Sequence, residues 1–442
     1  MRRIKTLLLL LLLTLPLFAQ GGKEKEGLTI TWWHSNSGVL QEATDSLVKE
    51  FNETVGKENN ITVEALYQGK ANDVLVKLKA VSADTNRSEY PDIVQLDATG
   101  VIDVASTDFI TYIDDLAKKN NDDLKFLQEN IKVSMEYKDK LIGMPFNSSA
   151  ILYYYNKTLF DEKGLNPPTS IDELIAIAPE LVEKDSKGNI TRYAFSNIPT
   201  TYELCAFIGN QNGVSYITDM ENGHLGTPTK TVFKEDGTLS FFLTKWKALY
   251  ETGALENASS GVSSSFVAGK TASYLASSSN LTTVIKNING RFELGVAPLF
   301  KVDENNDNGV NVGGGALFAI DKDDDKRDEA IWLFLKFATS KEEQLKWSMK
   351  TGYLPVNKDT YEMDEYKEFV EENPLFKVPA EELFASSPLV RGVWIPSGYQ
   401  VYYSFMSNID KMLKENISIE KIVETMANEI DGYLRDFYAT SN

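Results

Sequence analysis

Strand and helix patterns alternate over residues 28–96, and this alternation constrains the fold more than any other feature of the chain. Short apolar runs typical of strands are separated by amphipathic stretches typical of helices. The predicted order is strand 28–33, helix 39–51, strand 61–66, helix 72–81 and strand 91–96. Because strand–helix–strand units join parallel strands, ligand groups are expected at the carboxyl ends of these strands. His34, Ser35 and Asp97 occupy those ends.

Length and charge restrict the class of protein. The 442 residues are too many for one compact core and predict two lobes of ordinary domain size. The formal net charge is −19, with 64 Asp and Glu against 45 Lys and Arg. Nucleic acids and anionic membrane surfaces need clustered basic residues, so no nucleic-acid partner is expected.

The amino-terminal residues predict export. Arg2, Arg3 and Lys5 precede an apolar segment, 7–18, which ends at Ala19. This pattern is typical of a cleaved signal peptide over residues 1–19, and it predicts a periplasmic protein. No lipobox cysteine follows the cleavage point. The single cysteine, Cys205, allows no internal disulfide and is expected to be a buried apolar residue.

Residues 141–157, LIGMPFNSSAILYYYNK, place hydroxyls, an amide and three tyrosines in one apolar run. A buried strand would favour Val, Ile and Leu on both faces. The run therefore predicts a cleft wall suited to a sugar-like ligand.

The candidate residues for catalysis and metal binding are few. His34 and His224 are the only histidines, and neither lies near a G-x-S-x-G motif. The acidic run 321–325 lacks the EF-hand glycine, and the glycines at 313–315 precede a strand rather than a helix, unlike a phosphate loop. We expect no metal, no cofactor and no enzyme activity. A secreted carbohydrate-active enzyme, with two carboxylates across a cleft, is the alternative from another class.

Several aromatic side chains are candidates for either the core or a ligand site. Trp33 lies at a strand-to-helix turn, Tyr353 lies on a turn set by Gly352 and Pro355, and Trp394 lies in an aromatic stretch. Core packing is the competing interpretation for each of them.

Five segments in order give the chain a family resemblance. They are Trp33-His34-Ser35, 145–157, Ala276-Ser277-Ser278, 313–317 and 350–355 (KTGYLP). In this set the chain resembles the extracellular solute-binding proteins of ABC importers, family 1, of the maltose-binding type, and within them the glycerol-3-phosphate-binding branch.

The resemblance implies an α/β, two-lobe periplasmic binding protein fold of type II, with a hinge of crossing strands and a central ligand cleft. It implies lobe 1 at 27–146 plus 316–358, and lobe 2 at 147–315 plus 359–442. Motif by motif, it implies ligand contacts at Ser149, Ser277, Gly314 and Tyr353. The strand ends and the aromatic residues supply the other candidates. The complete set of candidate ligand-binding residues is Trp33, His34, Asp97, Ser149, Ser277, Gly314, Tyr353 and Trp394.

One departure from the branch bears on specificity. Trp394 aligns with the branch's phosphate-binding arginine, and an indole offers one donor and an apolar face that stacks on sugar rings. This favours a neutral sugar, although Arg391 lies close enough in sequence to keep a phosphorylated ligand open.

We therefore predict a monomeric periplasmic receptor that captures a carbohydrate and delivers it to the permease subunits of an ABC importer. The alternative within the class is an sn-glycerol-3-phosphate or glycerophosphodiester receptor.

Overall fold

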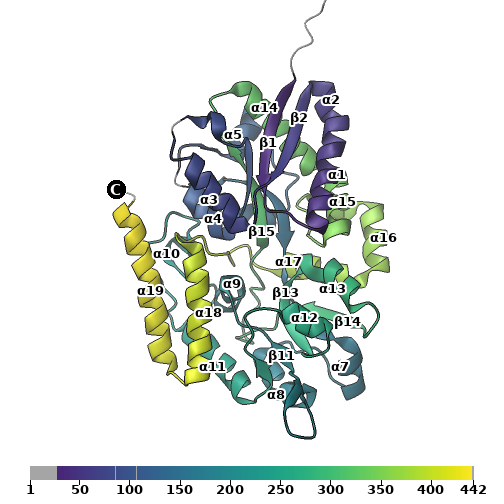
Figure 1. Cartoon of the computed structure of the whole chain (residues 1–442), viewed down its shortest axis with the longest axis vertical. Coiled ribbons are helices and arrows are strands. Elements are labelled where there is room, and N and C mark those ends of the chain that lie inside the picture. The colour runs from purple at the N-terminus through teal and green to yellow at the C-terminus, as the bar shows by residue number, and fades with distance from the viewer. Residues whose placement is uncertain (1–26, 85, 106, 441–442) are drawn as a thin grey trace, which may run out of the picture.

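The computed structural model describes residues 27–84, 86–105 and 107–440, and Figure 1 shows two lobes, one above the other. The predicted signal peptide, 1–19, lies outside the described residues. None of the helices in the described part is long and apolar enough to cross a membrane.

The upper lobe is built on a six-stranded sheet in the order β2-β1-β3-β15-β4, with β7 beside β15. The strands are β1 (Leu28–His34), β2 (Ile61–Tyr67), β3 (Ile93–Asp97), β4 (Ile110–Thr111), β7 (Met144–Ser149) and β15 (Gly313–Ile320). β1 pairs in parallel with both β2 and β3, as the alternating pattern predicts. β15 runs antiparallel to β3, so the sheet is mixed.

Helices cover both faces of this sheet (Figure 1). They are α1 (Val39–Glu53), α2 (Val55–Asn59), α3 (Ala71–Val81), α4 (Ala98–Ala105), α5 (Ile113–Lys119), α14 (Asp325–Ala338) and α15 (Lys341–Thr351). The apolar faces expected for α1 and α14 are buried: Leu47 and Phe51 on α1, and Phe334 on α14, where Phe51 meets Phe334 at 5.2 Å between ring centroids. Such aromatic contacts close the space between helix and sheet.

The lower lobe contains a three-stranded antiparallel sheet in the order β13-β8-β14, formed by β8 (Ile151–Asn156), β13 (Ser273–Ser277) and β14 (Leu294–Pro298). Its helices include α7 (Lys157–Lys163), α8 (Ile171–Leu181), α9 (Thr201–Gly209), α11 (Thr238–Glu251), α12 (Val262–Val267), α13 (Leu281–Ile288), α17 (Val378–Ala385), α18 (Gly398–Glu415) and α19 (Ile419–Thr440). The apolar period of residues 419–437 predicts a long helix from near Ser418, and this helix is α19, which packs against α18 and α11.

The tyrosines of β8 belong to the core of the lower lobe. Tyr153 lies against Phe195 and Phe300 on one face of the sheet, whereas Tyr154 lies against Tyr274 on the other. Both rings are 0% exposed. The prediction that the whole run 141–157 is a cleft wall is therefore wrong for these tyrosines, because alternate residues of a strand point to opposite faces and here both faces are covered.

Two chain crossings connect the sheets. β7 ends at Ser149 in the upper sheet and β8 begins at Ile151 in the lower sheet, so Ala150 alone separates them. β15 pairs with β7, and Gly313 stands opposite Ser149 at the point where both strands enter the upper lobe. The crossings thus bring the predicted serine and glycine motifs together between the lobes.

The helix signals in the sequence are accurate at their beginnings and less so elsewhere. Ser170 and Ser340 cap α8 and α15 through the amides of Glu173 and Glu343, as the S-x-x-E spacing predicts. Because proline lacks a backbone N–H, Pro179 predicts a break in this helix, but α8 continues to Leu181 and tolerates the missing donor. The composition of residues 259–265 predicts a loop, but the segment is partly helical because α12 begins at Val262.

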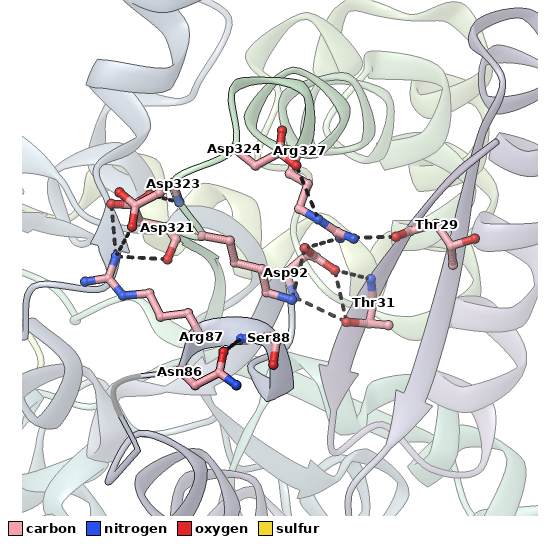
Figure 2. Close-up of polar contacts among 11 residues, drawn as sticks. Thr29, Thr31, Asn86, Arg87, Ser88, Asp92, Asp321, Asp323, Asp324 and Arg327 are labelled. Atoms are coloured by element: carbon pink, nitrogen blue, oxygen red, sulfur yellow. Dashed lines mark hydrogen bonds and ion pairs between the residues drawn. The ribbon is translucent and has the colours of Figure 1, made fainter. Parts of the chain in front are cut away.

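Asp92 directly precedes β3 and is the centre of a cluster of polar contacts in the upper lobe (Figure 2). One carboxylate oxygen accepts hydrogen bonds from the Thr31 amide at 2.8 Å and the Thr31 hydroxyl at 3.1 Å. The other accepts from Arg327 at 2.8 Å and lies 3.4 Å from Lys322. Asp92 therefore joins β1, β3 and the start of α14, and it is 1% exposed.

Candidate functional site

A cavity of about 370 Å³ lies between the lobes, where the crossings meet the carboxyl end of β3. Its lining is dominated by hydroxyl groups, tyrosine rings and backbone. The hydroxyl and tyrosine side chains are Thr99, Ser149, Thr200, Thr201, Ser277, Ser279, Tyr202, Tyr353 and Tyr402. The remaining lining comes from Asp97, Ala98, Cys205, 311–314, Gly392 and Val393.

The structure brings five of the predicted site residues to this cavity. Asp97, Ser149, Ser277, Gly314 and Tyr353 all line it, although they lie far apart in the sequence. That these residues contact a ligand stays a prediction.

Ser149 and Tyr353 are held side by side by backbone pairing. The Leu354 amide donates to the Ser148 carbonyl at 2.7 Å, which fixes the KTGYLP turn against the end of β7. Tyr353 is partly exposed toward the cavity, and burial of its hydroxyl raises the pKa, which the neighbouring Ser279 hydroxyl opposes. The ring remains a neutral phenol at any physiological pH.

Ser277 and Ser279 present hydroxyls from the end of β13. Their oxygens lie 2.9 Å apart, and the Ser277 oxygen also accepts from the Ser279 amide at 3.3 Å. The serine motif therefore folds into a compact turn that faces the cavity.

The glycines at the start of β15 are required by close packing. Gly314 has φ +104°, and a Cβ added there would lie 1.6 Å from the Asn147 carbonyl oxygen. A Cβ on Gly313 would lie 2.4 Å from the Tyr202 hydroxyl. The lack of side chains lets β15 approach β7 and lets Tyr202 lie over the strand.

Asp97 supplies the carboxylate of the lining. It accepts from the Thr99 amide at 3.0 Å and from the Thr99 hydroxyl. Burial raises its pKa, and the two Thr99 hydrogen bonds oppose that shift only in part.

The other three predicted residues do not line the cavity. Trp33 packs half-buried against the main core, and His34 is 0% exposed, with its Nδ1 accepting from the Asn36 amide at 3.2 Å. Trp394 is 1% exposed and stacks on His224 with 3.8 Å between ring centroids. The interpretation of Trp394 as a plate for a sugar is corrected here, because its indole face is covered by an imidazole.

Sequence reasoning missed the amino terminus of α9. Thr200, Thr201 and Tyr202 all line the cavity, and Thr200 caps the helix by accepting from the Tyr202 amide at 3.3 Å. Glu203 completes this cap by accepting from the Thr200 amide at 2.8 Å. The T-x-x-E spacing is a capping box and could have revealed the helix start, but not its place in the cavity.

The site is poor in catalytic groups. Burial raises the pKa of the Cys205 thiol to about 12, so the group stays protonated. Within the described residues, no Lys, Arg or His lines the cavity, and no group of three or more His, Cys, Asp or Glu could hold a metal ion. Arg391, beside Gly392, is directed to Glu221 at 3.4 Å.

Sequence comparison places the chain among exported binding proteins. Residues 46–377 match the family described as bacterial extracellular solute-binding protein. The chain is 25% identical over 372 residues to the sn-glycerol-3-phosphate-binding periplasmic protein UgpB of Yersinia pestis bv. Antiqua, with 81% of each chain covered. It is also 25% identical over 370 residues to UgpB of Escherichia coli O1:K1, with 82% of each covered.

Solved structures share the fold. UgpB from Mycobacterium tuberculosis in complex with glycerophosphocholine has a TM-score of 0.75 at 21% identity, covering 93% of this chain and 99% of that one. The cyclic alpha-maltosyl-1,6-maltose binding protein from Arthrobacter globiformis has a TM-score of 0.74 at 21% identity, covering 93% and 100%. The fold is thus the two-lobe, maltose-binding type, as expected. Because the family match spans most of its length, the chain belongs to the bacterial extracellular solute-binding proteins.

Proposed function

We propose that this protein is the substrate-binding component of an ABC importer, which captures a carbohydrate between its lobes and delivers it intact to a membrane permease. The observation that carries the proposal is the convergence of hydroxyl groups and tyrosine rings from both lobes on one cavity of about 370 Å³. A cavity of this size lies within the range used for small ligands.

The chemistry of the lining fits a polyhydroxylated ligand. Serine and threonine hydroxyls both donate and accept hydrogen bonds, as sugar hydroxyls do, and the carboxylate of Asp97 accepts from them. The rings of Tyr202, Tyr353 and Tyr402 provide apolar faces for the C–H surfaces of a sugar.

The same lining supports a receptor rather than an enzyme. Glycoside hydrolysis in its common form uses two carboxylates on either side of the scissile bond, whereas Asp97 is the carboxylate that faces this cavity within the described lining. Cys205 lacks the neighbouring histidine that would activate it, because His34 and His224 are packed elsewhere.

Location and partners complete the proposal. The leader at residues 1–19 supports export to the periplasm, where the monomeric receptor would dock on two permease subunits through both lobes. The negative net charge supports the expectation that no nucleic acid is bound.

A second candidate ligand is sn-glycerol 3-phosphate or a glycerophosphodiester. The names of the relatives from Yersinia and Escherichia favour it.

Calorimetry tests the proposal. Purified protein, freed of bound solute by unfolding and refolding, should bind maltose or maltotriose with a dissociation constant in the micromolar range or below, and chromatography should recover the sugar unchanged. Cleaved sugar would show an enzyme, and binding of sn-glycerol 3-phosphate alone would establish the second candidate.

A further inference from the structure

The charged side chains in the described lining of the cavity are of one sign. Its described lining includes the carboxylate of Asp97 and no basic side chain. Arg391 is adjacent in sequence to Gly392 of the lining, and its guanidinium lies 3.4 Å from the carboxylate of Glu221. A bound anion would therefore meet a negative group without a compensating positive one.

The amino terminus of α9 would ordinarily be favourable for an anion. A helix of 9 residues begins at the cavity wall, and the first amides of a helix carry partial positive charge. Here the chain's own Glu203 takes that place. Its carboxylate accepts from the Thr200 amide at 2.8 Å and from the Thr200 hydroxyl, and it is 9% exposed.

Glu203 lies directly behind the lining. It follows Tyr202, which faces the cavity, and burial raises the pKa of the Glu203 carboxyl, an effect that its hydrogen bonds from Thr200 oppose. Two carboxyl groups therefore flank the space from opposite lobes: Asp97 at the end of β3 and Glu203 in the first turn of α9. Among the residues that the structure describes, neither carboxyl forms an ion pair with a cation.

We infer that Asp97 and Glu203 form a charge filter that excludes phosphorylated and other anionic solutes and admits uncharged or cationic ones. The inference rests on the proposed function, and it names the charge class of the solute. An ionised carboxylate at either position repels an anion, and the repulsion is strong because the space is poorly solvated. A protonated Asp97 would offer the anion only one hydrogen-bond donor. Phosphate recognition instead relies on Arg, Lys or free helix amides.

One pyranose scaffold in three charge states tests the filter. Binding of D-glucose, D-glucosamine and D-glucose 6-phosphate is measured by calorimetry at pH 7, together with maltose and sn-glycerol 3-phosphate. The wild-type protein should bind the best uncharged or cationic solute at least about 100-fold more tightly than either phosphate ester.

Neutralising variants identify the residues responsible. Asp97→Asn and Glu203→Gln should each reduce the preference over phosphate esters at least about tenfold, and the double variant should reduce it further. Glutamine at the third helical position keeps the capping box, so α9 should remain folded, which circular dichroism checks. The readout is the ratio of the affinity for uncharged solutes to the affinity for phosphate esters. A residue with a merely structural role would weaken the binding of all solutes alike and leave this ratio unchanged.

Glu173→Gln is the matched control. Glu173 occupies the same third helical position in α8 and accepts from the amide of Thr169, the residue before the N-cap, at 2.7 Å; Figure 1 places α8 at the far end of the lower lobe. This variant removes one negative charge without changing the cavity, and its affinity ratio should equal that of the wild type.

Each outcome decides the inference. Wild-type protein that binds a phosphate ester as tightly as any uncharged solute would overturn it, even if sugars also bind and the proposed function stands. If no sugar binds, the carbohydrate proposal fails, and the double variant decides the filter: new binding of sn-glycerol 3-phosphate supports it, and continued lack of binding overturns it.

Discussion

Tyr353 is the residue at which a ligand contact can best be separated from a packing role. Its ring lines the cavity and is also packed, partly buried, against the main core. Tyr353→Ala should weaken sugar binding by about 1 to 3 kcal/mol through loss of ring contact and should also lower the free energy of unfolding through loss of packing. Tyr353→Phe should retain most of the affinity if the ring face carries the contact.

Calorimetry of both variants measures this effect. Tyr403→Ala is the control, because Tyr403 is 63% exposed and does not line the cavity. Equal affinities for Tyr353→Ala and the wild type would remove Tyr353 from the site.

His34 gives the protein a pH dependence of known sign. Burial lowers its pKa to about 4, opposed only in part by Asp45, whereas the unfolded chain has the ordinary value of about 6.5. Between these values the unfolded state binds more protons. The stabilising contribution is therefore complete above about pH 6.5 and is lost as the pH falls toward 4.

Urea unfolding at pH 7 and pH 5 checks this prediction. The wild type should lose about 2 kcal/mol more stability over this interval than His34→Gln, which lacks the titrating group. The difference between the proteins cancels the carboxyl groups that titrate in both. Identical losses would show that His34 is accessible to protons in the folded state.

At the scale of elements, the register of β15 depends on Gly314. Gly314→Ala should destabilise the protein by more than about 3 kcal/mol, since the new Cβ would overlap the Asn147 carbonyl and alanine strongly disfavours this backbone conformation. Gly164→Ala is the control, with φ +67° but nothing within 4 Å, and it should cost about 1 to 2 kcal/mol. Denaturant unfolding of both variants gives the comparison.

The Asp92 cluster joins the elements at the opposite end of the same sheet (Figure 2). Asp92→Ala should cost about 3 to 5 kcal/mol because it leaves two cations and the Thr31 amide without their acceptor. Glu50→Ala removes an exposed partner of Lys346 and should cost about 1 kcal/mol or less. Similar losses in the two variants would contradict a structural role for the cluster.

The sequence predicts elements well where hydrophobic period and capping agree. The parallel trio of strands follows from apolar runs at regular intervals, and the beginnings of α8 and α15 follow from Ser170 and Ser340. Pro179 and the serine-rich start of α12 misled because tertiary packing outweighs local propensity there. A short helix such as α12, with a composition typical of loops, is too short to show a hydrophobic period in the sequence.

The site was predictable only in part, and the reason is geometric. Ser149, Ser277 and Gly314 carry family motifs, so resemblance located them without knowledge of their positions in space. Trp394 and His224 show what the sequence could not predict. The two residues lie far apart in the sequence but stack on each other in the structure, and no local sequence pattern indicates this contact. Glu203 went unnoticed because its function depends on which helix end faces the cavity.

At the scale of the whole molecule, the reactivity of the single thiol measures whether the protein is folded. Cys205 is 2% exposed, and its pKa is raised to about 12 by burial. Alkylation by iodoacetamide at pH 8 should be at least about 1,000-fold slower in the native protein than in guanidinium chloride, since both access and thiolate fraction are reduced. Cys205→Ser is the control for reaction elsewhere, and native rates within tenfold of the unfolded rate would contradict the buried position.

The direction of β1 has a practical consequence. Leu28 begins this strand at the upper end of Figure 1, and β3 runs parallel to β1 and brings Asp97 to the cavity at its other end. A tether attached ahead of Leu28 would hold the molecule by its far pole. In a surface-mounted sensor made in this way, the upper sheet would separate the support from the cavity.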